Sequence, residues 1–516
     1  MSDTYSASSS VNLGSRFSQA YLWVIAASIV CYLVLAFSFA KVKTPWVDEG
    51  WVASAPANWA STGGFGTPCL EPSGSWLNAE LTGIQEYTYW NLPVGIVVQG
   101  LWYKALGFDL LRMRALGILC GLVAILSWFA ITWTLSGSRL AGSITAALLS
   151  VDYTFLWGAA DGRMDMMCVM FGSVGLTAYL LLRERSYVGS LWLANVLVAL
   201  SLFTHPNGML FLLGLIFLVI YYDRHRLSWR DVSTLLPYLI IASLWGLYIL
   251  VRPDYFLAQF GANASARGGT RWAMLVHPLR AIIQEILVRY IAHFGLRPLW
   301  GGPTPKYAIG IPFAYWITLI VLCTTAPIRR RGSVNALVAL AGGFFGFMTF
   351  VVGLKANCYL IFLIPLYTAL LAIWLCRSHD RRSITAPLSA VVTAGLLACQ
   401  LGTIVFKLQE NTYASEYTPT LNFVRSRLAG GQLIFADSYF GFDLGFDRVI
   451  DDTRLGYYSG RRADLIVEDL WYDWWWRKLY PGEEPQISRY VKDLLRADYH
   501  LVFERGPFRV YERRRT

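Results

Sequence analysis

The chain has 516 residues, of which 55% are hydrophobic and 15% are charged, and its formal net charge is +11. A soluble globular protein usually has about 25% charged residues, so this composition excludes an ordinary soluble domain. The apolar residues gather in runs of roughly 17–25 residues, the length of helix that crosses about 30 Å of hydrocarbon. Since backbone amides in lipid need internal partners, we predict membrane-spanning helices. The arginines stand in clusters between these runs, which indicates topology and anionic lipid headgroups rather than nucleic acid.

The first apolar run, 21–40, follows a polar, Ser-rich segment without a convincing cleavage site, so we predict a retained first span. Ten further spans are predicted near residues 111–136, 141–158, 165–182, 187–204, 208–222, 233–251, 308–326, 333–352, 357–376 and 385–406. Alternate short loops are rich in arginine, with Arg139, Arg183, Arg185, Arg224, Arg226, Arg230, 329–331, Arg377, Arg381 and Arg382. Such loops stay cytoplasmic, which predicts a cytoplasmic tail over 1–20 and a C-terminal segment on the other side.

Two loops on the non-cytoplasmic side are long, 41–110 and 252–307. The stretch 90–108 is apolar enough to span, but a span there would reverse the side of every later Arg-rich loop. We therefore predict an amphipathic helix on the outer surface, with Lys104 extending its amine to water. Segment 277–298 has a similar pattern, with apolar positions at helical spacing interrupted by Arg280, Glu285 and Arg289.

The composition changes after the last span, so we divide the chain into the tail 1–20, a membrane domain over 21–410 and an outer α/β domain over 411–516. Short β-like runs lie at 432–435, 465–467, 500–503 and 508–511, and helix candidates at 417–428 and 487–496. The cluster of Trp471, Trp474, Trp475 and Trp476 is typical either of a packed aromatic core or of a surface that contacts the membrane interface or a sugar. The eight cysteines show no Cys-x-x-Cys spacing, so neither a zinc site nor a disulfide framework is predicted.

Acidic residues stand at two predicted membrane boundaries on the non-cytoplasmic side. Asp48 and Glu49 follow the first span, and Asp161, Arg163 and Asp165 lie between the third and fourth spans. Carboxylates close to lipid are costly unless they are solvated or used, which favours a functional site. The alternatives are a solvated turn after Pro45 at the first position and an ion pair that closes a tight loop at the second.

Basic residues on the non-cytoplasmic side depart from the charge rule and require an explanation. Binding of a lipid phosphate provides one. The candidates for donor-phosphate binding are Arg112, Arg114, Arg163, Lys355 and Tyr359. His205 is a further candidate for the pocket, although a single histidine in a short loop is more often structural, and Tyr359 could instead anchor its helix at the interface. Glycosyl transfer needs a base for an acceptor hydroxyl and cations for the departing phosphate. Asp48 fits the first role and Lys355 with the arginines the second.

The serial order of several short motifs resembles the GT-C glycosyltransferases, in particular protein O-mannosyltransferases and the lipid A aminoarabinose transferase (glycosyltransferase families 39 and 83). The motifs are VDEG at 47–50, LPVG at 92–95, DLLRMRAL at 109–116, GRMDMM at 162–167, THP at 204–206 and KANCYLIFLIP at 355–365. They cover spans one to ten, about three-quarters of the chain. The resemblance departs at Asn91-Leu92, where relatives usually carry a basic residue before the proline of the surface helix, which puts one phosphate contact in doubt.

The resemblance implies an inverting enzyme that takes a sugar, a hexose or a pentose, from a polyprenyl-phosphate carrier. The resemblance implies that Asp48 is the catalytic base, with Glu49 beside it. It also implies that Asp165 is the catalytic aspartate of the second outer loop, although Asp161 competes for that role. Finally, Arg112 or Arg114 corresponds to an arginine that enters the second span, and Lys355 corresponds to the residue at the lipid phosphate. No cofactor is expected to be required, and a divalent cation between Asp48 and Asp165 is left open, because hard cations favour carboxylate oxygens.

We therefore predict a multi-pass glycosyltransferase of the bacterial cytoplasmic (inner) membrane that acts on a lipid, glycan or protein acceptor of the cell envelope, with membrane lipids but no nucleic acid as partners. Two alternatives stay open. A transporter or flippase of lipid-linked sugars would place charged residues at the midplane on broken helices, within inverted repeats. A non-catalytic scaffold would use the outer α/β domain to bind a ligand.

Overall fold

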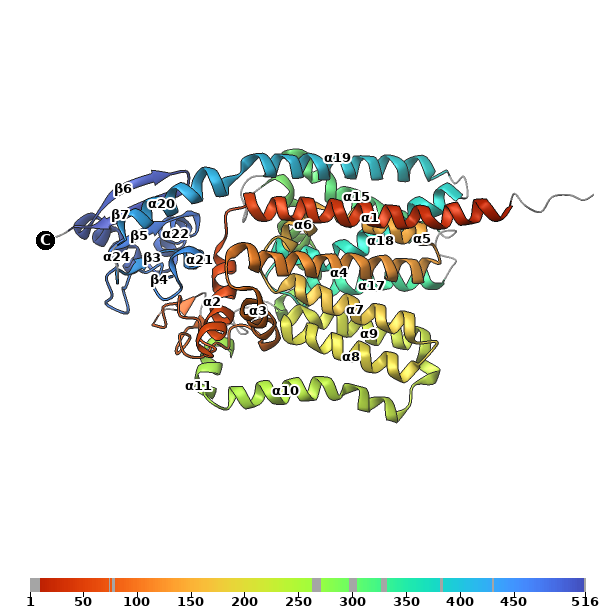
Figure 1. Cartoon of the computed structure of the whole chain (residues 1–516), viewed down its shortest axis with the longest axis horizontal. Helices are drawn as coiled ribbons and strands as arrows, with labels where there is room; N and C mark the ends of the chain where they lie inside the picture. The colour runs from red at the N-terminus through yellow and green to blue at the C-terminus, as the bar shows by residue number, and fades with distance from the viewer. Residues whose placement is uncertain are drawn as a thin grey trace, which may run out of the picture.

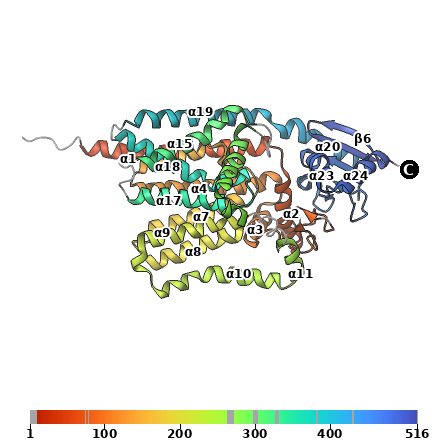
Figure 2. The same cartoon turned by 180° about the vertical axis from the view of Figure 1, so that it is seen from behind.

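The computed structural model describes residues 10–73, 75–76, 79–261, 271–296, 304–325, 332–380, 384–428 and 431–514. Long helices form a bundle, and shorter helices, loops and a small sheet cover one end of it (Figure 1). The view from behind shows the same arrangement (Figure 2). The predicted polytopic helical fold with a small α/β unit is confirmed. The arginines at 329–331, Arg381 and Arg382, and residues 1–9 of the predicted tail, lie outside the described residues.

Within the described residues, nine helical segments are long and apolar enough to cross a membrane. They contain α1 (Ser10–Val42), α4 (Leu110–Ser136), α7 (Asp165–Leu182), α8 (Tyr187–Thr204), α9 (Met209–Asp223), α10 (Leu236–Ile249), α15 (Gly310–Thr324), α17 (Gly332–Phe350) and α19 (Ala386–Glu410). A tenth is the pair α5 (Arg139–Ser150) and α6 (Tyr153–Ala159), which meet at 66°. The remaining predicted span, 357–376, overlaps α18 (Ile364–Asp380), which has only 17 residues.

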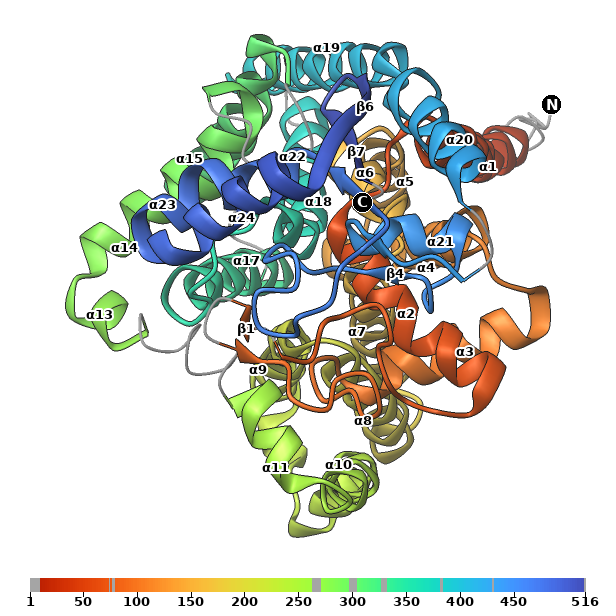
Figure 3. The ribbon, with the colours of Figure 1, turned by 90° about the vertical axis from the view of Figure 1, so that its left-hand side faces the viewer.

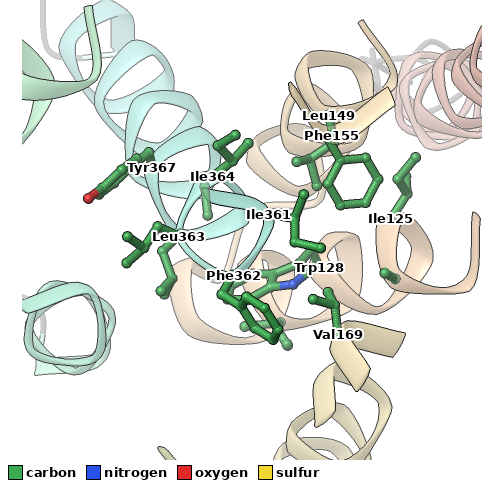
Figure 4. Packing of buried hydrophobic residues seen from close by; sticks show 14 of the residues in the cluster. Ile125, Trp128, Leu149, Phe155, Val169, Ile361, Phe362, Leu363, Ile364 and Tyr367 are labelled. Carbon is green, nitrogen blue, oxygen red and sulfur yellow. The ribbon is translucent and has the colours of Figure 1, made fainter. Parts of the chain in front are cut away.

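Helix α18 occupies the centre of the bundle. Residues 359–374 are buried without interruption, which explains why this segment is apolar on all its faces. Just before the helix, Ile361 and Phe362 lie against Trp128 of α4, Phe155 of α6 and Val169 of α7 (Figure 4). In lipid such contacts stabilise mainly through close packing, because the hydrocarbon is as apolar as the side chains. The residues that enter this helix are therefore held firmly in place.

The bend between α5 and α6 has its own polar support. Asp152 accepts hydrogen bonds from the Phe155 amide (2.8 Å), the Tyr315 hydroxyl (2.6 Å) and the Gln400 side-chain amide (2.5 Å). Gln400 in turn accepts from the Tyr153 amide at 2.7 Å. Broken helices are tolerated at membrane depth only where the freed backbone groups find partners inside the protein. Here Gln400 of α19 is the partner of the freed Tyr153 amide, and Tyr315 of α15 is a partner of the Asp152 side chain.

The cover at one end of the bundle includes two short helices, α2 (Val47–Thr62) and α3 (Pro93–Leu106). Helix α3 has 14 residues and is not among the span candidates, as expected for a surface helix. The predicted helix 277–298 corresponds to α14 (Pro278–Gln284) and a π-helix, η5 (Glu285–Leu296), with residues 297–298 outside the described part. Its charges differ from the expectation of a surface helix, since Glu285 and Arg289 are fully buried.

The C-terminal unit contains a five-stranded sheet with the order β4-β3-β5-β7-β6. The strands are β3 (Ile434–Phe435), β4 (Val449–Ile450), β5 (Leu465–Glu468), β6 (Tyr499–Arg505) and β7 (Phe508–Arg513). Strand β3 is parallel to β4 and β5, whereas β7 is antiparallel to β5 and β6. The helices α20 (Thr418–Arg427) and α24 (Pro485–Asp498) coincide with the two predicted ones. Four of the five strands were predicted, and only β4, two residues long, was missed.

Helix α2 is fixed against the C-terminal unit by short polar contacts (Figure 3 looks onto this end). The Trp51 indole donates to Asp451 at 2.7 Å, and the Ser438 hydroxyl donates to the carbonyl of Val47 at 3.0 Å. A side chain at Gly50 would approach the backbone of Ser438 to 2.4 Å, so this position requires glycine. The C-terminal unit thus holds the helix that carries Asp48.

Burial of carboxyl groups at this contact makes its stability depend on pH. Burial raises the pKa of Asp451 from 3.8 to about 7, against the opposing hydrogen bond from Trp51. Because the folded state holds the proton more tightly than the unfolded chain does, this contribution is complete below about pH 4 and is lost as the pH rises to 7. We expect Asp451→Asn, which keeps a neutral side chain, to reduce the fall in melting temperature between pH 4.5 and 8, measured by thermal unfolding. An unchanged pH profile in that variant would refute this assignment.

Candidate functional site

Asp48 and Glu49 lie side by side in the first turn of α2, where the helix dipole favours negative charge. Their surroundings differ sharply. Glu49 is fully buried, whereas the Asp48 side chain is 27% exposed. Helical geometry explains the difference, because consecutive residues point about 100° apart around the axis. The two carboxylates therefore have separate partners and separate roles.

Glu49 forms a buried, bidentate ion pair with Arg114 of α4. The Arg114 Nε and Nη2 groups donate to the two carboxylate oxygens at 2.7 Å each, and Nη1 donates to the carbonyls of Ala40 (2.8 Å) and Lys43 (2.9 Å). Burial acts to raise the pKa of Glu49, but Arg114 outweighs it and the pKa is lowered. Four of the five N–H groups of the guanidinium are therefore engaged inside the protein. In this arrangement Glu49 and Arg114 join α1, α2 and α4 and do not present a surface to a ligand.

Asp161 is also occupied by a protein partner. Lys43 lies 3.3 Å from its carboxylate, and the Trp46 indole donates to it at 2.6 Å. Burial raises the pKa of Asp161 to about 6, with Lys43 opposing the shift. Lys43 was missed by the sequence analysis, although its position at the non-cytoplasmic end of the first predicted span was a signal comparable to that of Lys355. The pair closes the corner between α1 and the loop before α7.

The central feature is Arg163, whose guanidinium bridges two carboxylates. Its Nη1 donates to Asp48, and its Nε donates to Asp165 at 2.6 Å. His205 completes the group, with its Nε2 3.5 Å from Asp165. The His205 Nδ1 accepts from the Asn207 amide at 3.1 Å, which places the ring proton on Nε2, facing Asp165. The structure thus brings together four of the predicted site residues, Asp48, Arg163, Asp165 and His205, and Asp48 is the carboxylate with the greater exposure.

Tyr359 connects this group to a second buried cluster. The Arg163 and Arg289 guanidinium groups each lie 6.0 Å from the centre of its ring, and the His205 ring lies 5.5 Å away. Glu285 pairs with Arg289 at 3.1 Å and with Lys355 at 3.1 Å. Sequence analysis missed Glu285 and Arg289 as site residues because their pattern fitted a surface helix.

The amine of Lys355, the residue predicted at the donor phosphate, lies among backbone carbonyls and the Glu285 carboxylate. The amine donates to the carbonyls of Met348 (2.8 Å), Thr349 (2.6 Å) and Val352 (2.9 Å) at the end of α17. Burial lowers its pKa, with Glu285 acting in the opposite direction. An ammonium group has three donors, and here three backbone carbonyls and the Glu285 carboxylate surround it. In this arrangement Lys355 caps a helix and neutralises Glu285.

Arg112 is not brought to the cluster. It starts α4, where its amide is capped by Asp109 at 2.7 Å, and its guanidinium pairs with the same aspartate at 3.3 Å. Its side chain is 50% exposed. Arg112 and Arg114 are two residues apart on one helix, so they point about 200° apart around its axis. Of the two arginines that the motif left open, one is buried against Glu49 and the other is an exposed ion pair.

The place considered for a divalent cation, between Asp48 and Asp165, is taken by the Arg163 guanidinium. Among the described residues there is also no group of three or more His, Cys, Asp or Glu side chains arranged to hold a metal. A guanidinium presents planar paired donors that match carboxylate oxygens, and its positive charge balances them. The residues present therefore do not form a metal site in this arrangement.

No family model matches this sequence, and comparison with curated proteins finds no match. Comparison with solved structures finds proteins of similar fold. ArnT from Cupriavidus metallidurans bound to undecaprenyl phosphate is 14% identical, with a TM-score of 0.59 over 95% of this chain and 97% of that one. AglB, an oligosaccharyltransferase from Archaeoglobus fulgidus in complex with an inhibitory peptide and a dolichol-phosphate, is 11% identical, with a TM-score of 0.56 over 95% of this chain and 74% of that one. The GT-C fold implied by the sequence motifs is therefore confirmed.

Proposed function

We propose that this chain, which has the fold of polytopic GT-C glycosyltransferases, transfers a sugar from a polyprenyl-phosphate donor to an acceptor hydroxyl with inversion at the anomeric carbon. The observation that carries the proposal is the group of Asp48, Arg163 and Asp165, where a partly exposed carboxylate lies beside a cation able to hold a phosphate. The lipid phosphates bound by the structural neighbours support a donor of this class.

In the proposed reaction, Asp48 takes the proton of the acceptor hydroxyl as its oxygen attacks the anomeric carbon. The bond from that carbon to the phosphate oxygen breaks, and the lipid phosphate leaves with the electron pair. Arg163 stabilises the charge that grows on the phosphate, since arginine matches phosphate oxygens with paired donors. Asp165, oriented by His205, holds the guanidinium in place.

The ion pair between Asp48 and Arg163 couples donor binding to base strength. While Arg163 donates to Asp48, that carboxylate is stabilised as an anion and is a poor proton acceptor. A donor phosphate that engages the same guanidinium competes with Asp48 and releases it. The base thus becomes available when the donor is in place, which limits the competing reaction of the donor with water.

We place the site on the non-cytoplasmic side of a bacterial inner membrane, because the Arg-rich loops of the sequence mark the opposite face. The donor sugar is a hexose or a pentose, and the acceptor is a lipid, glycan or protein of the cell envelope. No metal takes part in the proposed steps.

The proposal is tested by incubating the purified protein in lipid nanodiscs with radiolabelled polyprenyl-phosphate sugars and a membrane extract. We expect one donor to lose its label to a product in the extract. A folded protein that discharges none of these donors would overturn the proposed function.

The arginines offer a matched pair of variants for the same assay. We expect Arg163→Gln to slow transfer about 100-fold, since it removes a donor from the developing phosphate charge. Arg163→Lys keeps the charge but loses the paired geometry, so part of the activity should return. Arg112→Gln, which changes an exposed ion pair with Asp109, should transfer like the unaltered protein. Equal losses for Arg112→Gln and Arg163→Gln would contradict this assignment.

A further inference from the structure

An open recess of about 410 Å³ lies beside the end of α10 that adjoins α2 and α3. Figure 1 shows α10 at the edge of the bundle, with the short helix α11 (Pro253–Phe256) at this end. The recess shares no residue with the group around Arg163. Pockets for small ligands usually have about 300–1,000 Å³, so there is room for one here. The lining residues are Gly63, Gly64, Phe65, Glu86, Tyr87 and Tyr248.

Three aromatic rings border the recess. The Tyr248 ring centre lies 5.6 Å from that of Phe65 and 6.3 Å from that of Tyr87, at interplanar angles of 55° and 44°. Because the rings are tilted against one another, they do not form a flat layer and can border a hollow from different sides. The face of an aromatic ring attracts a cation that lies within about 6 Å of its centre. The apolar part of the recess therefore suits an organic cation.

A buried glutamine, Gln259, holds these walls in place. Its side-chain amide donates to the carbonyls of Thr82 (2.9 Å) and Tyr87 (3.0 Å), and its oxygen accepts from the Tyr89 amide at 2.8 Å. The Tyr89 ring lies 4.9 Å from that of Tyr248, and its hydroxyl donates to the Tyr248 carbonyl at 3.1 Å. The loop and α10 are thus fixed relative to one another before any ligand binds, which lowers the entropy that binding costs.

Glu86 gives the recess its charge. Its side chain is exposed, and among the described residues no lysine or arginine forms an ion pair with it. A carboxylate and an aromatic face both attract positive charge, and the carboxylate also accepts hydrogen bonds from an ammonium group. Anionic ligands would meet repulsion here, and neutral ones would use neither attraction. The lining of the recess therefore favours a ligand with an ammonium group.

The recess lies at a membrane boundary, where lipid headgroups are found. Tyr248 is the next-to-last residue of the span candidate Trp229–Ile249. The side chains of Leu247, Leu250 and Leu257 are exposed, as expected for a surface in contact with lipid. Tyrosine is common at this level as an anchor at the membrane interface, but such anchoring requires neither a hollow nor a carboxylate.

We propose that this recess binds the ammonium headgroup of phosphatidylethanolamine, whose acyl chains lie along the exposed apolar side chains of α10. A primary ammonium group has three N–H donors to offer to Glu86, whereas the quaternary ammonium of phosphatidylcholine has none. The inference does not depend on the proposed function, because it concerns a lipid that surrounds the protein and no step of sugar transfer.

Native mass spectrometry of the full-length protein in detergent tests this inference. The protein is titrated with phosphatidylethanolamine, phosphatidylcholine or phosphatidylglycerol of the same acyl chains. We expect phosphatidylethanolamine to bind about tenfold more tightly than phosphatidylglycerol. Glu86→Gln and Tyr87→Leu should each weaken its binding about fivefold without weakening that of phosphatidylglycerol. The controls Glu184→Gln and Tyr458→Leu change side chains that are 72% and 52% exposed and lie outside the recess, and should bind like the unaltered protein.

Several results would overturn the inference. Equal binding of phosphatidylethanolamine and phosphatidylglycerol would do so, as would equal losses in the recess and control variants. Phosphatidylcholine that bound as tightly as phosphatidylethanolamine would show that Glu86 accepts no hydrogen bond from the headgroup. If soluble glucosamine bound through Glu86 while the three lipids bound alike, the recess would take a free amine and the lipid assignment would be wrong. Because Glu86 is exposed, Glu86→Gln should fold normally even if Tyr87→Leu does not, and thermal unfolding checks both.

Discussion

Replacing Asp48 with asparagine is expected to lower the rate of sugar transfer about 10²–10⁴-fold, the usual contribution of a general base. Asparagine has nearly the same shape but cannot take the acceptor proton. Because Asp48 is partly exposed and Arg163 keeps its ion pair with Asp165 in the variant, we expect the melting temperature to change little. The measurement is the initial rate of label transfer from the donor, with thermal unfolding as the check on folding.

Asp109→Asn is the matched control, since it changes another aspartate that pairs with an arginine, Arg112, on the exposed start of α4. It should transfer at close to the normal rate. If Asp48→Asn kept more than half of the activity, the base would have to be another group. A non-catalytic scaffold would instead keep its ligand in Asp48→Asn and show no transfer in either form.

Replacing the adjacent Glu49 with alanine is expected to have an equally large effect of a different kind. Its removal leaves the buried guanidinium of Arg114 without its counter-charge, and breaking a buried ion pair in this way costs about 3–5 kcal/mol. We expect a marked fall in melting temperature and in the yield of folded protein. Thermal unfolding of the purified protein measures it.

A double variant shows whether this cost comes from the unpaired charge. Glu49→Leu combined with Arg114→Met replaces the pair with apolar groups of similar volume, and such replacements are often neutral or stabilising. The double variant should therefore be more stable than Glu49→Ala. A Glu49→Ala protein with an unchanged melting temperature would contradict the structural role of the pair.

The long helices could be predicted because hydropathy alone sets the length of a span, and each predicted span has a helix at its position. The strands β5, β6 and β7 were recognisable as apolar runs between turn residues. Strand β4 has only two residues, Val449 and Ile450, and its pairing with β3 depends on partners far away in the chain. The burial of Glu285 was hidden for a similar reason, since one of its counter-ions, Lys355, lies far away in the chain.

Some residues of the candidate site could be predicted from the sequence, and others could not. Motif order and charge placement singled out Asp48, Arg163 and Asp165, which the structure brings together. The choice between Arg112 and Arg114 could not be made from sequence, because hydropathy does not say which face of α4 points inward. The same limit applies to Lys355, whose backbone partners at the end of α17 could not be foreseen from its charge.

The bend between α5 and α6 bears on how the protein is assembled in the membrane. Its polar corner is satisfied by Tyr315 and Gln400, which are translated more than 160 and 245 residues after Asp152. Until those helices arrive, Asp152 and the amide of Tyr153 lack the partners that the finished bundle provides. The polar corner of the first half of the chain is therefore completed only when α19 has entered the bundle.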